Sequence, residues 1–347
     1  MKKSTVFIVD DSSVVRNLIR ESMVSVEGLM LSGAASNGRL ALPRIQAYQP
    51  NFVILDYEMP EMNGIETLEE IKKISPESKV IMFSSHTTKG AKVTLEALGK
   101  GAIDFVPKPS STKSSDPVKY IKENLIEKII NLTEHSLQKT KVAPNIIKRK
   151  LRPAGSFRFC FIGVSTGGPQ LLREFLPKFS AKFSGSIFIT QHMPAMFTDQ
   201  LAKSLDSHSE LTVKEAVHLD EVKPGTVYIA PGGGHMQVKK HGVTYKTHVL
   251  ADPPYLNCQP SVNIMFQSIH VMNPAECVAV LLTGMGDDGY GEWPKLHENG
   301  TYLIAQNQAS SLVYGMPRKP HENNLIDFSG DIQGIAAKIT SLIGNSW

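Results

Sequence analysis

The stretch that decides the fold of the first half of the chain is residues 52–56, FVILD. The turn-like QPN at residues 49–51 comes directly before it. Four consecutive apolar residues with β-forming character are typical of a strand buried on both faces, as in a parallel sheet covered by helices. The stretch therefore predicts an α/β fold with a carboxylate at the carboxyl end of an inner strand.

Other short apolar runs surround this stretch, and helical patterns separate them. The runs cover residues 5–9, 79–83 and 102–106, and the helical stretches cover residues 14–26, 65–74, 92–99 and 117–137. Strands that alternate with helices predict βα units, whose right-handed crossovers bring the carboxyl ends of the strands to one edge of the sheet. Any functional site of this domain should lie at that edge.

A change of pattern divides the chain of 347 residues, a length for which two domains are the prior expectation. Residues 139–155 are dense in lysine and arginine, contain Pro144 and Pro153, and lack a sustained hydrophobic period. We predict a linker there, between a first domain at residues 1–138 and a second at residues 156–347. In the second, apolar runs at residues 159–164, 186–190, 226–230 and 278–282 predict another doubly wound, parallel α/β sheet.

Composition restricts the class of protein. The chain is 41% hydrophobic and 20% charged, which is typical of a globular domain, and its three cysteines form no CxxC pair. No apolar run approaches the ~18 residues of a membrane span, and no signal peptide is evident. The basic excess lies mainly in the linker rather than in a folded domain, so we expect no nucleic-acid partner. These features predict a cytoplasmic protein without direct membrane insertion.

Three carboxylates are predicted at neighbouring strand ends in the first domain. Asp10 and Asp11 follow the run at residues 5–9, and Asp56 follows the run at residues 52–55. Because such carboxylates repel one another, they favour a hard cation such as Mg²⁺. An alternative is that Asp10 and Asp11 only cap the following helix. Ser84 and Lys108 follow two other predicted strands, where a hydroxyl and an ammonium could contact a phosphoryl group.

A candidate nucleophile follows the first strand of the second domain. Residues 163–168 are GVSTGG, which satisfies the G-x-S-x-G pattern between a strand and a helix and exposes the Ser165 hydroxyl on a tight turn. A glycine-rich turn can also bind phosphates, so nucleotide binding is an alternative from this motif alone. The chain has no GxxxxGK[ST] sequence that would support that alternative.

A nucleophilic serine needs a base and an acid that orients the base. His192 follows the run at residues 186–190, and Asp287 and Asp288 follow the run at residues 278–282. Each candidate lies just beyond a predicted strand, where an open α/β sheet forms its sites. A conventional α/β-hydrolase order would require a later histidine, His297 or His321, neither of which follows a clear strand.

The motifs of the first domain resemble those of the response-regulator receiver family. They are Asp10-Asp11, residues 56–60 (DYEMP), Asn63-Gly64, Ser84 and Lys108-Pro109. The resemblance implies a flavodoxin-like (βα)5 fold in which Asp56 accepts a phosphoryl group. It further implies that Ser84 and Lys108 sense that group. The implied Mg²⁺ ligands are Asp10, Asp11, Asp56 and the backbone carbonyl of Tyr57.

The motifs of the second domain resemble the catalytic domain of the chemotaxis protein-glutamate methylesterases. They are residues 163–168, 191–194, 230–233, 282–289, 305–306 and 314–317. The resemblance implies hydrolysis of glutamate γ-methyl esters on chemoreceptors, deamidation of glutamines, a chemotaxis histidine kinase as phosphodonor, and no cofactor for the hydrolysis. It implies that Ser165 is the nucleophile, His192 the base and Asp288 the orienting acid. Backbone N–H groups of Thr166 and Met285 would form the oxyanion hole.

Two segments depart from the family pattern. Gln259 and Asn263 stand where an arginine and an aspartate are usual, and residues 290–294 (YGEWP) replace small residues. They motivate an alternative function: a phosphorylation-dependent receptor-binding regulator whose esterase domain is weakened or inactive. In either case we expect the unphosphorylated receiver to cover the Ser165 cleft and phosphorylation to open it.

Overall fold

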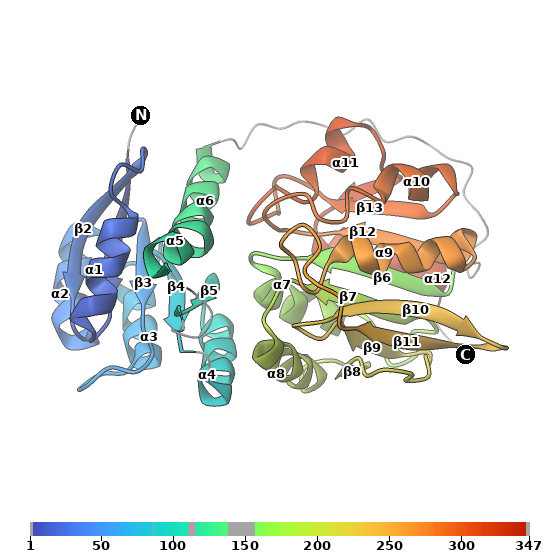
Figure 1. The fold of residues 1–347 in the computed structure, drawn as a ribbon, viewed down its shortest axis with the longest axis horizontal. Coiled ribbons are helices and arrows are strands. Elements are labelled where there is room, and N and C mark those ends of the chain that lie inside the picture. The colour runs from blue at the N-terminus through green and yellow to red at the C-terminus, as the bar shows by residue number, and fades with distance from the viewer. Residues whose placement is uncertain (1–2, 86, 110–115, 138–156, 345–347) are drawn as a thin grey trace. The chain divides into compact units, whose positions relative to one another are not determined.

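The computed structural model describes residues 3–85, 87–109, 116–137 and 157–344. The chain divides into two compact units, residues 1–138 and residues 139–347 (Figure 1). The predicted linker at residues 139–155 lies outside the described residues. Within the described part of the chain, no helix has the length and apolar character that crossing a membrane would require.

The first unit contains one parallel five-stranded sheet in the order β2-β1-β3-β4-β5. Its strands are β1 (Ser4–Val9), β2 (Leu29–Ala35), β3 (Phe52–Leu55), β4 (Lys79–Ser84) and β5 (Asp104–Pro107). The apolar run FVIL at residues 52–55 forms β3, which is fully buried between β1 and β4. This strand order is the flavodoxin-like one, so the predicted fold of the first domain is confirmed.

Helices connect these strands: α1 (Ser13–Ser22), α2 (Gly38–Tyr48), α3 (Gly64–Ile74) and α4 (Thr88–Gly99). The single helix predicted at residues 117–137 is α5 (Pro117–Ile121), a π-helical turn (Lys122–Ile126) and α6 (Glu127–Leu137) in immediate succession. The apolar side chains Ile121, Leu125 and Ile129 are fully buried. Their spacing of four explains why the pattern predicted one amphipathic helix over this range.

The second unit contains a parallel seven-stranded sheet in the order β14-β13-β12-β6-β7-β9-β8. Its strands are β6 (Phe159–Val164), β7 (Ser186–Gln191), β8 (Thr212–Glu215), β9 (Thr226–Ile229), β12 (Cys277–Leu281), β13 (Tyr302–Gln306) and β14 (Phe328–Gly330). The first strand of this unit, β6, lies between β7 and β12, so the winding of the sheet reverses at this point. Open α/β sheets bind their ligands at such a reversal, beyond the carboxyl ends of the strands.

Helices cover both faces of this sheet, as the doubly wound prediction requires (Figure 1). They are α7 (Gly168–Phe175), α8 (Ala195–Asp206), α9 (Val262–Val271), α10 (Trp293–Glu298), α11 (Arg318–Glu322) and α12 (Ile332–Ile343), with short 3-10 turns at Leu176–Lys178 and Pro274–Glu276. Helix α9 packs against β6 and against an antiparallel hairpin, β10 (His235–His241) and β11 (Thr244–Leu250). Aromatic stacking of Phe161 on Phe188, and of Phe188 on Tyr228, fills the core on the α9 side.

Candidate functional site

The acidic residues of the first unit meet at the carboxyl edge of its sheet. Val9 of β1 pairs with Leu55 of β3, which places Asp10 and Asp56 side by side just beyond the two strands. Both carboxylates are buried, whereas Asp11 is exposed. Each of the three side chains contributes one carboxylate oxygen to a cluster, and these oxygens lie within 4.8 Å of one another. A set of close carboxylate oxygens of which one belongs to an exposed residue suits Mg²⁺.

Lys108 supplies the positive charge of this cluster. Its Nζ lies 2.9 Å from Asp10 Oδ2 and 2.7 Å from Asp56 Oδ2. Burial raises the pKa of Asp56 more than the ammonium lowers it, which places that pKa at about 6. Burial likewise outweighs Lys108 at Asp10 and raises its pKa. A divalent cation at these carboxylates would add positive charge to that of Lys108 and lower both pKa values.

The remaining predicted receiver residues lie at the same edge. Ser84, buried at the end of β4, accepts a backbone hydrogen bond from Lys108 through its carbonyl at 2.7 Å. The carbonyl of Tyr57 accepts from the Gly64 N–H at 2.9 Å, and a side chain at Gly64 would lie 2.3 Å from the Asp56 carbonyl oxygen. Glycine at position 64 thus permits the loop after Asp56 to turn tightly.

The alternative role of Asp10 and Asp11 as helix caps is not what the structure shows. Ser12 is the N-cap of α1, and its hydroxyl accepts from the Val15 N–H. Asp10 instead accepts from the Ser12 N–H at 2.9 Å with one oxygen and faces Lys108 with the other. Capping therefore does not account for the burial of the Asp10 carboxylate beside Asp56.

In the second unit, Ser165 occupies the turn between β6 and α7. Its N–H donates to the Thr283 carbonyl at 3.0 Å, and its own carbonyl accepts from the Gly168 N–H at 2.8 Å. Gly167 has a φ of 78°, a left-handed conformation that glycine adopts at little cost. These contacts hold Ser165 at the first residue beyond β6, with its side chain partly exposed.

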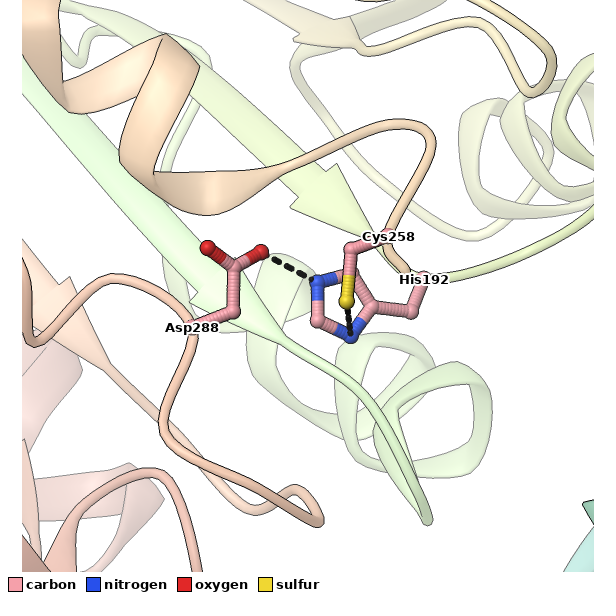
Figure 2. A group of neighbouring side chains, drawn as sticks. All are labelled: His192, Cys258 and Asp288. Atoms are coloured by element: carbon pink, nitrogen blue, oxygen red, sulfur yellow. Dashed lines mark hydrogen bonds and ion pairs between the residues drawn. The ribbon is translucent and has the colours of Figure 1, made fainter. Parts of the chain in front are cut away.

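His192 occupies the equivalent position beyond β7, because Val164 pairs with Gln191 across the two strands. The His192 N–H donates to the Val164 carbonyl at 3.1 Å. Its ring Nε2 lies 2.8 Å from Asp288 Oδ2 (Figure 2). The structure thus brings together the predicted histidine and the predicted acid from residues 96 positions apart in the chain.

Asp288 is held by the amino end of α9 as well as by His192. Its Oδ1 accepts from the Ser261 hydroxyl at 2.9 Å and the Asn263 N–H at 3.0 Å, and its Oδ2 accepts from the Val262 N–H at 2.7 Å. Backbone donors at a helix amino terminus stabilise a carboxylate, both by hydrogen bonding and by the helix dipole. The carboxylate is therefore fixed in place and aimed at the His192 ring.

The charges of the pair follow from these contacts. Burial raises the pKa of Asp288, but the hydrogen bonds from His192 and from α9 outweigh it and lower that pKa below its usual value. An ionised carboxylate can only accept, so Nε2 of His192 carries the proton and Nδ1 is the basic nitrogen. Burial lowers the pKa of His192, while the hydrogen bonds with Asp288 and Cys258 outweigh this and raise it to about 9.

Nδ1 of His192 faces a residue that the sequence did not single out as functional. Cys258 Sγ lies 4.0 Å from it, over the ring in the view of Figure 2. Among the described residues, no hydrogen bond joins the Ser165 hydroxyl to either ring nitrogen. Catalytic hydrogen bonds are often loose in ligand-free structures, so the adjacent strand-end positions of Ser165 and His192 still suit a nucleophile and its base.

Gln191 is a second residue of the site that sequence reasoning missed. Its Nε2 donates to the carbonyl oxygens of Ser165 at 3.0 Å and His192 at 3.1 Å, which ties the two strand ends together. A side chain at Gly168 would lie 1.9 Å from Gln191 Oε1, so glycine is needed for this contact. The sequence signals were that Gln191 directly precedes His192 at the end of a strand and that it belongs to the motif at residues 191–194, but neither signal assigned it a role.

The loop that carries Met285 also packs against the Ser165 turn. The Thr283 hydroxyl donates to the Thr166 carbonyl at 3.1 Å, and a side chain at Gly284 would approach Ser165 Cβ to 2.8 Å. Thr166 and Met285 therefore belong to two loops that meet beside the candidate nucleophile. This is the location that backbone donors to a developing oxyanion require.

Several nearby candidates have structural roles. Asp287 is exposed and pairs with Lys319 rather than with His192. His235 is buried; its Nδ1 accepts from the Ser261 N–H at 3.0 Å, and its Nε2 lies 3.0 Å from the Pro253 carbonyl. His321 contacts the Pro317 carbonyl and Ser329. Of these histidines, His192 is the one whose ring contacts Asp288.

The segments that depart from the family pattern are built into the fold. Gln259 donates to the Asp252 carbonyl at 2.7 Å, and buried Asn263 accepts from the Glu292 N–H at 3.2 Å. Trp293 is buried, and its indole N–H donates to the Leu325 carbonyl at 2.6 Å. The altered residues therefore support α9 and α10, and they leave the His192–Asp288 contact in place.

Together, the fold and the site define a class: a doubly wound α/β domain with a serine, a histidine and an acid at its strand ends, joined in one chain to a receiver. Family models agree. The response regulator receiver domain matches residues 6–115, and the CheB methylesterase domain matches residues 160–339. The chain belongs to the CheB family of chemotaxis methylesterases.

Individual relatives match over nearly the whole chain. The protein-glutamate methylesterase/protein-glutamine glutaminase of Trichodesmium erythraeum is 36% identical and covers 99% of this chain and 100% of its own length. That of Geobacillus kaustophilus is 38% identical with the same coverage. Among solved structures, the CheB methylesterase catalytic domain of Thermotoga maritima is 37% identical, with a TM-score of 0.51, and covers 53% of this chain and 97% of that one.

Proposed function

We propose that this chain hydrolyses the γ-methyl esters of glutamate side chains on chemoreceptors, that it deamidates glutamines of the same receptors, and that phosphorylation activates both reactions. The names of its relatives and its two family domains support this activity. The observation in the structure that carries the proposal is the contact of His192 with Asp288, one strand away from Ser165.

In the proposed reaction, Nδ1 of His192 accepts the proton of the Ser165 hydroxyl as its oxygen attacks the ester carbonyl. Asp288 keeps the proton on Nε2 and stabilises the imidazolium that forms. The backbone N–H groups of Thr166 and Met285 stabilise the oxyanion, each by roughly 3–4 kcal/mol. His192 then donates this proton to the methoxide leaving group, which departs as methanol, and water hydrolyses the acyl-enzyme by the same steps. No cofactor takes part in this hydrolysis.

The first unit serves as the switch in this proposal. Asp56 accepts the phosphoryl group from the chemotaxis histidine kinase, and Lys108 and Ser84 contact it afterwards. Mg²⁺ bound by Asp10, Asp11, Asp56 and the Tyr57 carbonyl would neutralise charge during the transfer. A cytoplasmic location, residues 1–138 as the receiver and residues 156–347 as the catalytic domain are parts of the same proposal.

The alternative, a receptor-binding regulator with an inactive esterase, has less support. The residues that motivated it, Gln259, Asn263 and Trp293, make structural contacts at α9 and α10, and none of them takes the place of Ser165, His192 or Asp288. Replacement of the proposed nucleophile distinguishes the esterase hypothesis from the receptor-binding hypothesis. Ser165→Ala should abolish methanol release from methylated receptors while the melting temperature and receptor binding stay near those of the wild type. Turnover by that variant would contradict the assignment of Ser165.

A further inference from the structure

The group of His192, Cys258 and Asp288 brings together three types of metal-binding atom. One nitrogen, one sulfur and one oxygen of these side chains lie within 4.8 Å of one another (Figure 2). The proposed hydrolysis uses the nitrogen and the carboxylate but has no role for the thiol. We propose that Cys258 Sγ and His192 Nδ1 bind one Zn²⁺ ion, with Asp288 supporting the imidazole, and that the bound ion inhibits the hydrolase.

The separation of the two donor atoms suits a shared zinc ion. Zn–S and Zn–N bonds of about 2.3 and 2.0–2.1 Å at a tetrahedral angle place the two donors about 3.5 Å apart. In the structure His192 Nδ1 and Cys258 Sγ are 4.0 Å apart. Closing the site therefore requires a rotation of the Cys258 side chain that shortens this distance by about half an ångström and moves Sγ toward the plane of the ring, where the Nδ1 lone pair lies.

Asp288 provides the support that metal-binding histidines usually have. Such histidines donate their second ring N–H to a carboxylate, which fixes the tautomer and the direction of the metal-binding nitrogen. Here Nε2 donates to Asp288 Oδ2 at 2.8 Å, which leaves the lone pair on Nδ1, the nitrogen that lies 4.0 Å from Cys258 Sγ. Both oxygens of Asp288 already accept from Ser261, Val262 and Asn263. In this proposal Asp288 is therefore not a zinc ligand but orients the His192 ring through Nε2. Water molecules occupy the remaining coordination positions of the zinc ion.

The loop before α9 holds the thiol in place and leaves it accessible. Cys258 and Tyr255 exchange two backbone hydrogen bonds of 2.9 and 3.0 Å, and Cys258 is partly exposed. By contrast, Cys160 and Cys277 are fully buried in adjacent strands of the sheet, where desolvation raises their thiol pKa values. Cys258 is thus the cysteine suited to a soft metal, whereas the oxygen-only cluster in the first unit suits Mg²⁺.

Zinc at this position would inhibit because it occupies the lone pair that removes the Ser165 proton. This consequence rests on the proposed role of His192 as the base. The binding itself does not, because it requires only the geometry of the thiol and the imidazole. The same site would also bind Co²⁺, which reports a thiolate ligand by its charge-transfer absorption.

The test uses the full-length chain, with excess Mg²⁺ to fill the acidic site. Buffered Zn²⁺ at micromolar concentration should lower the rate of methanol release at least tenfold, and a chelator should restore it. Cys258→Ala, compared with its own zinc-free rate, should need at least tenfold more zinc for the same inhibition. Asp252→Asn, on the same loop, should respond like the wild type. Equal inhibition of the wild type and Cys258→Ala would overturn the proposal, as would the absence of inhibition.

Cobalt binding gives a readout that does not depend on activity. Ser165→Ala should show the thiolate-to-cobalt band when titrated with Co²⁺ in excess Mg²⁺, and Ser165→Ala/Cys258→Ala should lose it. A missing band in the first variant would refute the metal site. If Ser165→Ala kept esterase activity yet showed the band, the proposed nucleophile would be wrong while the metal site would stand.

Discussion

Nε2 of His192 lies 2.8 Å from Oδ2 of Asp288, and that carboxylate is itself fixed by the amino end of α9. The base of the proposed reaction is therefore positioned from two directions: by β7, which precedes the histidine, and by α9, through the acid. Because two of the donors to Asp288 are backbone N–H groups of α9, the position of the acid depends in part on the fold rather than on flexible side chains alone.

Asp288→Asn should lower kcat for methanol release by about 10³–10⁴-fold, because the neutral amide no longer fixes the tautomer or stabilises the imidazolium. The pH profile should change as well. The base must be neutral, and the hydrogen bonds with Asp288 and Cys258 raise the pKa of His192 to about 9 despite burial. Activity of the wild type should thus rise with pH up to that value, and loss of the carboxylate should move the midpoint to lower pH.

Asp287→Asn is the matched control for this prediction. Asp287 is the preceding residue, is exposed and pairs with Lys319, so its replacement should change kcat only a few-fold and leave the midpoint of the pH profile in place. Similar losses in the two variants, or an unmoved midpoint in Asp288→Asn, would refute the assigned role of Asp288.

Gln191→Ala should lower kcat about tenfold and leave KM within a few-fold of the wild type. The amide ties the carbonyl oxygens of Ser165 and His192 together, and its loss would loosen the alignment of nucleophile and base rather than substrate binding. Steady-state kinetics would measure this, with Gln200→Ala on α8 as the control. If KM rose while kcat stayed constant, Gln191 would instead belong to the substrate-binding surface.

Lys108→Met should destabilise the first unit by about 3 kcal/mol, since it leaves the buried carboxylates of Asp10 and Asp56 without their cation. Mg²⁺ should recover much of this loss because it would bind the same oxygens. Denaturant unfolding with and without Mg²⁺ would measure both effects. Lys119→Met, which removes an exposed pair with Glu123, should change stability by less than about 1 kcal/mol. A Lys108 variant as stable as the wild type without Mg²⁺ would contradict this account of the cluster.

The strands that were predicted correctly are those whose sequence carries the signal by itself. Runs such as residues 52–55 and 159–164 are buried on both faces, so they are apolar without interruption. The edge strand β2 was missed because it contains Ser32 and Gly33 and exposes Met30. The polar β10–β11 hairpin was missed for the same reason, since much of its surface faces solvent.

The residues of the candidate site likewise fall into those that the sequence could predict and those that it could not. Ser165, His192 and Asp288 could be proposed because each follows a recognisable strand. Gln191, Ser261 and Cys258 could not, because their roles depend on which loops meet beyond the strands. The contact of Ser261 with Asp288, for instance, joins positions 27 residues apart, and no local pattern encodes it.

The most direct test of the whole account is methanol release from methylated receptors by the full-length protein, with and without a small phosphodonor in the presence of Mg²⁺. We expect the phosphodonor to raise the rate at least tenfold in the wild type. It should leave Asp56→Asn at the unstimulated rate and produce no methanol with Ser165→Ala. A wild-type rate that does not respond to the phosphodonor, or equal stimulation of Asp56→Asn, would contradict the claim that the receiver controls the hydrolase.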